Sequence, residues 1–208
     1  MTLGERIDRI FNTGEIELAG EAYKRKYELG NMKSIKDFIL DKLRKVYINL
    51  STGDKITLSH NSAGKLARHY KDGEVYQKSL AHIPEIIENM QFLEEMPPKG
   101  NDAKYDKYSY YITQAKIDGQ LYTILSTVGR KRQEIYYDHN VFKGTPEEVF
   151  AKANNEKSDP KYSRLKEILQ DTDNKKGRIE TYLGRNQGAL TASTNKYTKN
   201  SGDVQEEG

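Results

Sequence analysis

The chain has 208 residues, which suits one ordinary domain and makes two full domains unexpected. Its 34 basic and 31 acidic residues leave a formal net charge of only +3, which excludes a polyanion-coating protein and a strongly acidic solvating chain. Hydrophobic residues make up 35% of the chain, so we expect a small core with loosely packed ends. Because cysteine is absent, disulfide frameworks, thiolate zinc sites and cysteine nucleophiles are excluded.

Hydropathy and residue spacing argue against a membrane, a metal and a cofactor. No stretch approaches the roughly 20 apolar residues of a membrane span, and MTLGERIDRIF lacks the apolar run of a secretion signal. We therefore expect a cytoplasmic protein without a membrane partner. The four histidines, at positions 60, 69, 82 and 139, have no paired carboxylates at helical offsets, and no phosphate-cradling glycine loop occurs. The sequence thus predicts neither a metal site nor a cofactor.

The first 58 residues predict helices followed by a short hairpin. Apolar residues at three-and-four spacing, around Ile7 and Ile10, then Ile16 and later Ile35, are typical of amphipathic helices over residues 1–45. Between Val46 and Leu58 the period changes, and VYINL and KITL flank Ser-Thr-Gly-Asp. This pattern predicts two short strands around a turn.

Two further helices are predicted before the main β region. Over 61–71 the apolar side chains lie on one side of a helix, and Asn61, Lys65, Arg68 and His69 lie on the other. A second helix is expected from about Ser79 or Pro84 to Glu95, with an acidic outer face.

Residues 105–143 predict a three-stranded antiparallel meander. KYSYYITQAKI and QLYTILSTV are joined by Asp118-Gly119, a strong hairpin signal, and EIYYDHNVF follows a turn at 129–133. Thr145 is the expected cap of a further helix, and a last amphipathic stretch covers 162–169. Beyond Asp171 the periodicity fades, so we expect a disordered tail.

These elements predict an α+β fold with N-terminal helices, two helices packed on one face of an antiparallel β-meander, a C-terminal helix and a disordered tail. The expected organisation is an N-terminal helical segment (1–45), an α+β core domain (46–143), a C-terminal helical segment (144–171) and a flexible tail (172–208). No internal repeat is present.

The polar stripe of the 61–71 helix is the first candidate for chemistry. Metal-independent RNA cleavage needs a base, an acid and a cation near the phosphate, and His69, Lys65 and Arg68 could divide these roles. The same stripe would also be the ordinary solvated face of a basic amphipathic helix.

The end of the last strand is the second candidate. Strand alternation places His139 and Asp138 on opposite faces, so Asp138 cannot orient His139 within a regular strand. His139 could instead face Lys65 and His69 across the fold, or be a packing residue. In the middle strand Thr127 could hydrogen-bond a phosphate through its hydroxyl, or it could be there only because threonine favours β-strands.

Tyrosines and basic residues are interleaved in the β region. Seven tyrosines, including Tyr110 and Tyr122, accompany Arg130, Lys131 and Arg132, and aromatic rings among cations suit stacking on single-stranded bases. Tyrosine is also a good strand former, and the basic run could be a charged hairpin turn.

The order of these motifs resembles the large polyvalent protein-associated domains of phages and mobile elements. The resemblance covers about 55–143 and rests on a Ser-x-x-Lys helix ending at Lys65, the run SLAHIPEIIEN, the IDGQLYTI hairpin and YYDH. Domains of this kind are similar to the barnase, EndoU, colicin and RelE group of ribonucleases, in which helices pack on one face of an antiparallel sheet. The resemblance implies a histidine, a lysine or arginine and a hydroxyl near the sheet, for which Lys65, His69, Thr127 and His139 are the candidates.

Two functions follow from the sequence. In the first, the domain acts on RNA, as a metal-independent endoribonuclease or a degenerate relative of one, with catalytic candidates Lys65, His69, His139 and Thr127. RNA would be bound by Asn61, Arg68, Tyr110, Tyr122, Arg130, Lys131 and Arg132. In the second, a non-catalytic module binds a partner protein, such as a defence or toxin component, through the acidic 79–95 helix and the tyrosine-rich sheet. The near-neutral charge and that acidic helix weigh against RNA, because RNA binding normally needs a stronger basic footprint.

Overall fold

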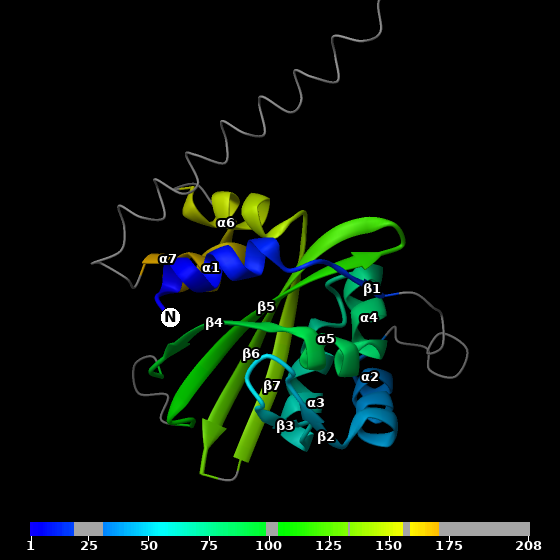
Figure 1. Ribbon diagram of the computed structural model, residues 1–208. Coiled ribbons are helices and arrows are strands. Elements are labelled where there is room, and N and C mark those ends of the chain that lie inside the picture. The colour runs from blue at the N-terminus through cyan, green and yellow to red at the C-terminus, as the bar shows by residue number, and fades with distance from the viewer. Residues whose placement is uncertain (19–30, 99–103, 133, 156–158, 171–208) are drawn as a thin grey trace, which may run out of the picture.

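A mixed β-sheet with helices on both faces organises the chain (Figure 1). The computed structural model describes residues 1–18, 31–98, 104–132, 134–155 and 159–170, so the expected disordered tail and the middle of the 1–45 segment lie outside the described residues. The helices are α1 (Leu3–Asn12), α2 (Met32–Phe38) with the π-helix η1 (Ile39–Leu43), α3 (His60–Leu66) with the 3₁₀ helix η2 (Ala67–His69), α4 (Glu74–Ala81), α5 (Ile83–Asn89), α6 (Pro146–Asn154), the 3₁₀ helix η3 (Pro160–Tyr162) and α7 (Ser163–Gln170). The strands are β1 (Ile16–Leu18), β2 (Val46–Ile48), β3 (Lys55–Thr57), β4 (Gln91–Met96), β5 (Lys107–Ile117), β6 (Gln120–Lys131) and β7 (Glu134–Lys143).

The predicted meander is confirmed as β5–β6–β7. Asp118 and Gly119 join β5 to β6 with φ angles of 51° and 76°, the left-handed pair that a tight two-residue hairpin requires. β4 and β1 both pair with the outer edge of β5, β4 along its first part and β1 along its last three residues. β4 is antiparallel to β5, and β1 is parallel to it, so the whole sheet is mixed.

Two predicted helices are wrong in part. Ile16–Leu18 is strand β1, and the helix expected to reach Glu95 ends at Asn89 before β4. Leu93 and Met96 are three residues apart, a spacing typical of a helix. In β4 a β-bulge between Phe92 and Glu94 adds a residue, so that both apolar side chains reach the same core cluster from a strand.

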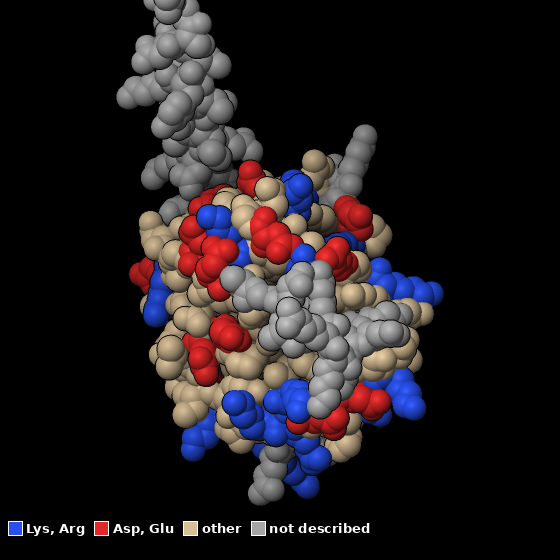
Figure 2. Space-filling model, turned by 90° about the vertical axis from the view of Figure 1, so that its right-hand side faces the viewer, with Lys and Arg blue, Asp and Glu red and all other residues tan. Residues whose placement is uncertain are grey.

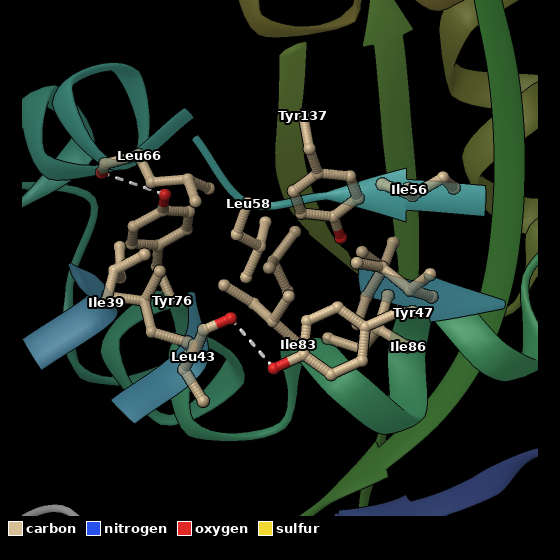
Figure 3. Close-up of a cluster of buried hydrophobic side chains, with 14 of the residues drawn as sticks. Ile39, Leu43, Tyr47, Ile56, Leu58, Leu66, Tyr76, Ile83, Ile86 and Tyr137 are labelled. Atoms are coloured by element: carbon tan, nitrogen blue, oxygen red, sulfur yellow. Dashed lines mark hydrogen bonds between the residues drawn. The ribbon is translucent and has the colours of Figure 1, made fainter. Parts of the chain in front are cut away.

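Face A of the sheet, as we call it, is covered by α2 to α5 and the confirmed β2–β3 hairpin. The predicted packing of helices on one face of the meander is thereby confirmed. Two tyrosines inside this cluster satisfy their hydroxyls on helix ends: Tyr76 donates to the Leu66 carbonyl at 3.0 Å and Tyr47 to the Leu43 carbonyl at 2.9 Å (Figure 3). Burial raises the pKa of Tyr47 to about 12, with the carboxylates of α5 adding to the effect.

Face B carries a second core beneath α1, α6 and α7 (Figure 1). Helices from the two ends of the chain meet here, with the rings of Phe11 and Phe150 edge to face at 5.5 Å between centroids. Thr145 caps α6 as predicted, in a capping box with Glu148. The sheet is therefore the middle layer of three.

Helix α3 lies along the outer edge of β7 and hydrogen-bonds to it. The Tyr137 amide donates to the Ser62 hydroxyl at 3.0 Å, and the Ser59 hydroxyl donates to the Ile135 carbonyl at 3.2 Å. These contacts satisfy backbone groups that an edge strand would otherwise expose. The outer side of α3 consequently reaches past the sheet edge toward face B. None of the helices in the described part of the chain is long and apolar enough to cross a membrane.

Candidate nucleic-acid interface

Strand register builds a polar floor on the part of face B that lies toward the end of β6. Alternation along the three meander strands places two cross-strand rows on this face. The rows are Tyr108–Gly129–Tyr136 and Tyr110–Thr127–Asp138. They form a small grid of rings, a hydroxyl and a carboxylate beside the helices of face B.

Three tyrosine rings gather above Gly129. The rings of Tyr105 and Tyr136 are stacked at 5.3 Å between centroids, and Tyr105 meets Tyr108 edge to face at 5.6 Å. A Cβ atom at Gly129 would lie only 3.0 Å from the rings of Tyr105 and Tyr108. Glycine therefore allows these rings to approach the sheet closely.

Side chains from three other parts of the chain close the walls of a groove over this floor. Helix α3 supplies His60, Asn61, Gly64 and Lys65, and the following η2 supplies Arg68. Lys104 precedes β5 and Arg164 lies on α7. The enclosed space, which we call the tyrosine groove, has a volume of about 500 Å³. Four of its lining side chains are cations and four are tyrosines: Lys65, Arg68, Lys104 and Arg164, and Tyr105, Tyr108, Tyr110 and Tyr136.

The cations of the groove differ in their acidic partners. Lys65 and Arg68 form no ion pair within the described part of the chain, whereas Arg164 pairs with Glu167 at 2.9 Å. Arg164 also hydrogen-bonds to the Tyr110 hydroxyl and lies 4.7 Å from the centroid of that ring. Figure 2 shows the side of the molecule that carries α2 and α4, where Lys and Arg predominate at the lower end and both signs of charge are mixed above it.

Among the described residues, Asp138 is the one carboxylate in the lining of the tyrosine groove, and His69, which is not a lining residue, lies next to it. The Tyr136 hydroxyl donates to Asp138 Oδ2 at 3.0 Å, and His69 Nε2 lies 3.5 Å from the same oxygen. Asp138 is 6% exposed, and its Oδ1 has no hydrogen-bond partner among the described residues.

His69 lies between two carboxylates. Its Nδ1 donates to Asp72 Oδ2 at 2.9 Å while Nε2 faces Asp138. The Asp138 carboxylate is the main cause of a raised His69 pKa; partial burial opposes it and Asp72 reinforces it. Burial, reinforced by Asp138, raises the pKa of Tyr136, so its phenol stays a hydrogen-bond donor.

His139 lies on the other side of β7, as strand alternation requires. It is fully buried on face A against the ring of Tyr76, at 5.1 Å between centroids. Its Nε2 is 2.8 Å from the Ser79 hydroxyl, which itself donates to the Tyr76 carbonyl, so Nε2 carries the proton. Burial lowers the pKa of His139 to about 4. The structure therefore does not bring His139 to Lys65 and Thr127.

The remaining predicted residues divide between the groove and other places. Asn61, Lys65, Arg68, Tyr110 and Thr127 line it. Tyr122 and Arg130 belong to face A by register, where Arg130 pairs with Asp54 at 3.1 Å. Lys131 ends β6 and Arg132 lies in the turn after it, and both are outside the groove lining.

Several groove residues were not predicted from the sequence as site residues. Strand alternation already places Tyr136, Asp138 and Asn140 on one face of the last strand, and this signal could have found them as a group. No local signal marks Lys104 or Arg164, because only the packing of α7 on face B brings Arg164 to the sheet. Within the described ranges, no three His, Asp or Glu side chains are grouped closely enough to hold a metal ion.

The fold and groove define an α+β domain with a cationic, tyrosine-lined recess at one edge of its sheet. Residues 24–137, more than half of the chain, match the family model of large polyvalent protein-associated domain 3, and the chain belongs to this family. The match spans α2 to the start of β7, including the α3 wall and most of the floor of the groove but not Arg164. A search of curated proteins and a search of solved structures each found no match.

Proposed function

We propose that this domain, as part of a phage or mobile-element protein, binds single-stranded RNA in the tyrosine groove. The observation that carries the proposal is the meeting of four cations and four tyrosines around about 500 Å³ of open space. Phosphates are held by Lys and Arg, and unpaired bases stack on aromatic rings. The concentration of cations at one recess supplies locally the basic footprint that the whole-chain charge lacks.

The acidic residues of the 79–95 segment give weaker support to the alternative function, binding of a partner protein. Residues 79–95 do not form one acidic helix but parts of α4, α5 and β4. Two of the four glutamates are already paired, Glu94 with Arg6 at 2.5 Å and Glu95 with Lys107 at 2.8 Å. The free acidic surface is smaller than the sequence suggests, so RNA is the better-supported ligand.

Binding is tested with labelled, unstructured RNA and the double variant Lys65→Gln/Arg68→Gln. Affinity should fall about tenfold or more, and the slope of log K against log salt should decrease by about 1.4, because each lost contact to a single strand removes about 0.7. The matched control is Lys33→Gln/Lys36→Gln, which removes two exposed cations from α2. Equal effects of the two double variants, or no RNA binding by the original protein, would reject the proposal.

Metal-independent cleavage is a second candidate, favoured by His69 beside Asp138 at the groove. In this reaction the RNA 2′-oxygen attacks the adjacent phosphorus and the 5′-oxygen leaves with a proton. The products are a 2′,3′-cyclic phosphate and a 5′-hydroxyl. Asp138 and His69 would accept the proton of the 2′-hydroxyl and supply the proton of the leaving 5′-oxygen, while Lys65 stabilises the charge on the phosphorane. His139 has no part in this scheme, since it is buried on face A.

Cleavage is tested by incubating labelled RNA with the protein in EDTA. If the candidate holds, cyclic phosphate ends appear and His69→Ala slows their formation by about 10²- to 10⁴-fold, the usual contribution of a general acid or base. Binding without cleavage would identify a non-catalytic RNA-binding domain. Absence of both, with a protein co-purifying through residues 79–95, would favour the partner-protein alternative.

A further inference from the structure

A second hollow adjoins the tyrosine groove on the other side of the first turn of α3. It has a volume of about 370 Å³ and is lined by Arg44, Thr57, Leu58, Ser59 and Ile135 together with His60 and Asn61. His60 and Asn61 also line the tyrosine groove, and both are exposed. The two spaces are therefore neighbours separated by two polar side chains. We call the second space the Arg44 hollow.

The chemistry of the Arg44 hollow suits one nucleotide. Arg44 is exposed and forms no ion pair with any described residue, so its guanidinium is available to a phosphate. The partly exposed Ile135 gives the lining an apolar part, against which a base or ribose can lie, and the Thr57 hydroxyl is a hydrogen-bonding group beside it.

Arg44 is held at a defined place by an unusual backbone. It directly follows the π-helix η1, a rare conformation that occurs frequently at functional sites. The carbonyl of Leu43 accepts the Tyr47 hydroxyl at 2.9 Å, and Tyr47 is itself buried. The helix end that carries Arg44 is thus anchored in the face A core.

We propose that the Arg44 hollow is a second nucleotide subsite, which an RNA strand enters after crossing His60 and Asn61 from the tyrosine groove. This inference rests on the proposed RNA binding. A mononucleotide or very short oligonucleotide fills the groove alone, whereas a longer single strand occupies both spaces. The natural ligand is then a stretch of several unpaired nucleotides.

The test compares the binding of labelled uridine trinucleotide and nonanucleotide by fluorescence anisotropy. Uridine oligomers are chosen because they do not pair with themselves. The original protein should bind the nonanucleotide at least about tenfold more tightly, since the longer strand adds a phosphate contact to Arg44 and an apolar contact to Ile135. Arg44→Gln should weaken nonanucleotide binding about five- to tenfold, lower its salt slope by about 0.7 and leave trinucleotide binding unchanged.

The matched control is Lys42→Gln, which removes an exposed cation from η1 outside both spaces and should change neither affinity. Trinucleotide binding without any gain from length would overturn the second subsite and leave the groove proposal standing. So would an Arg44→Gln loss that is equal for both lengths. If neither oligonucleotide binds, the groove proposal fails and the second subsite fails with it.

Discussion

Two histidines on opposite sides of β7 have opposite electrostatic surroundings. His69 lies between Asp72 and Asp138, which favour its charged form, and His139 is enclosed among Tyr76, Ser79 and other face A side chains that favour its neutral form. The surroundings of this residue type therefore favour its charged form beside the groove and its uncharged form in the core.

Because His139 is buried in its neutral form, we expect the protein to lose stability in mild acid. Its pKa is about 4 in the folded protein and 6.5 ordinarily, so the unfolded chain binds more protons between these pH values. The free energy of unfolding should fall by on the order of 3 kcal/mol as the pH is lowered from 6.5 to 4. Urea unfolding of the original protein and of His139→Gln across this range measures the effect.

In His139→Gln the free energy of unfolding should fall less steeply as the pH is lowered from 6.5 to 4. His60→Gln, at an exposed position, serves as the control. His69 acts in the opposite direction. Its pKa is raised, so its contribution is complete below 6.5 and is lost as the pH rises through the raised value. An acid limb that persists unchanged in His139→Gln would contradict the assignment.

At the scale of elements, the contact between α3 and the edge of β7 both protects the sheet and places the groove wall. Ser62 has two roles there, because its hydroxyl accepts the Tyr137 amide and completes the capping box with Ser59. The hydroxyl is fully buried.

Ser62→Ala should therefore lower the free energy of unfolding by about 1–3 kcal/mol, the cost of leaving a buried backbone donor without a partner. Denaturant unfolding measures it, with Ser163→Ala at an exposed helical position as control. Amide exchange at Tyr137 should accelerate in the variant. A loss no larger than in Ser163→Ala would show that the hydroxyl does not satisfy this edge.

Substitution by alanine at Gly129 and at Gly64, both beside the groove, should change the stability in opposite directions. A methyl group at Gly129 would press on the rings of Tyr105, Tyr108 and Tyr136, at 3.0–3.1 Å. Gly129→Ala should lower stability and disturb RNA binding by displacing the rings. Gly64 is helical with nothing within 4 Å of its Cβ direction, so Gly64→Ala should stabilise by about 0.5–1 kcal/mol.

Thermal unfolding of both variants, together with near-ultraviolet circular dichroism of the tyrosines, checks this pair. A changed tyrosine signal is expected in Gly129→Ala alone. Equal stability changes in the two variants would mean that the ring cluster tolerates the methyl group.

At the scale of the molecule, two cores share one sheet. Face A packs on Ile124, Val128 and Tyr137 of the meander, and face B on alternating residues of the same strands, such as Leu125 and Phe142. Loss of either helical layer exposes one whole side of those strands to water. The layers should therefore depend on each other for stability.

We expect one cooperative unfolding transition that core variants of either face shift alike. Leu66→Ala on face A and Phe150→Ala on face B, both essentially fully buried, should each cost about 3–5 kcal/mol. The measurement is amide exchange of the opposite face together with far-ultraviolet circular dichroism. A Phe150→Ala transition in which α1, α6 and α7 unfold while face A stays protected would show that the helical segments at the two ends of the chain are separate units.

Local patterns in the sequence were enough for the elements whose signals are short-range. The Asp118-Gly119 turn, the Thr145 cap and the polar side of α3 were predicted because turn conformation, capping and helical periodicity depend on neighbouring residues. Alternation also separated His139 from Asp138 before any tertiary contact was known.

The tertiary structure decided what depends on distant partners. Leu93 and Met96 have a spacing that suits a helix, and pairing with β5 made them part of a bulged strand. Lys104 and Arg164 became groove residues only because the loop before β5 and helix α7 pack against the end of the meander. Residue type and spacing determined which side chains could bind a phosphate or a base. Which of them meet in one recess was decided by packing on the two faces of the sheet, since that packing joins segments far apart in the chain.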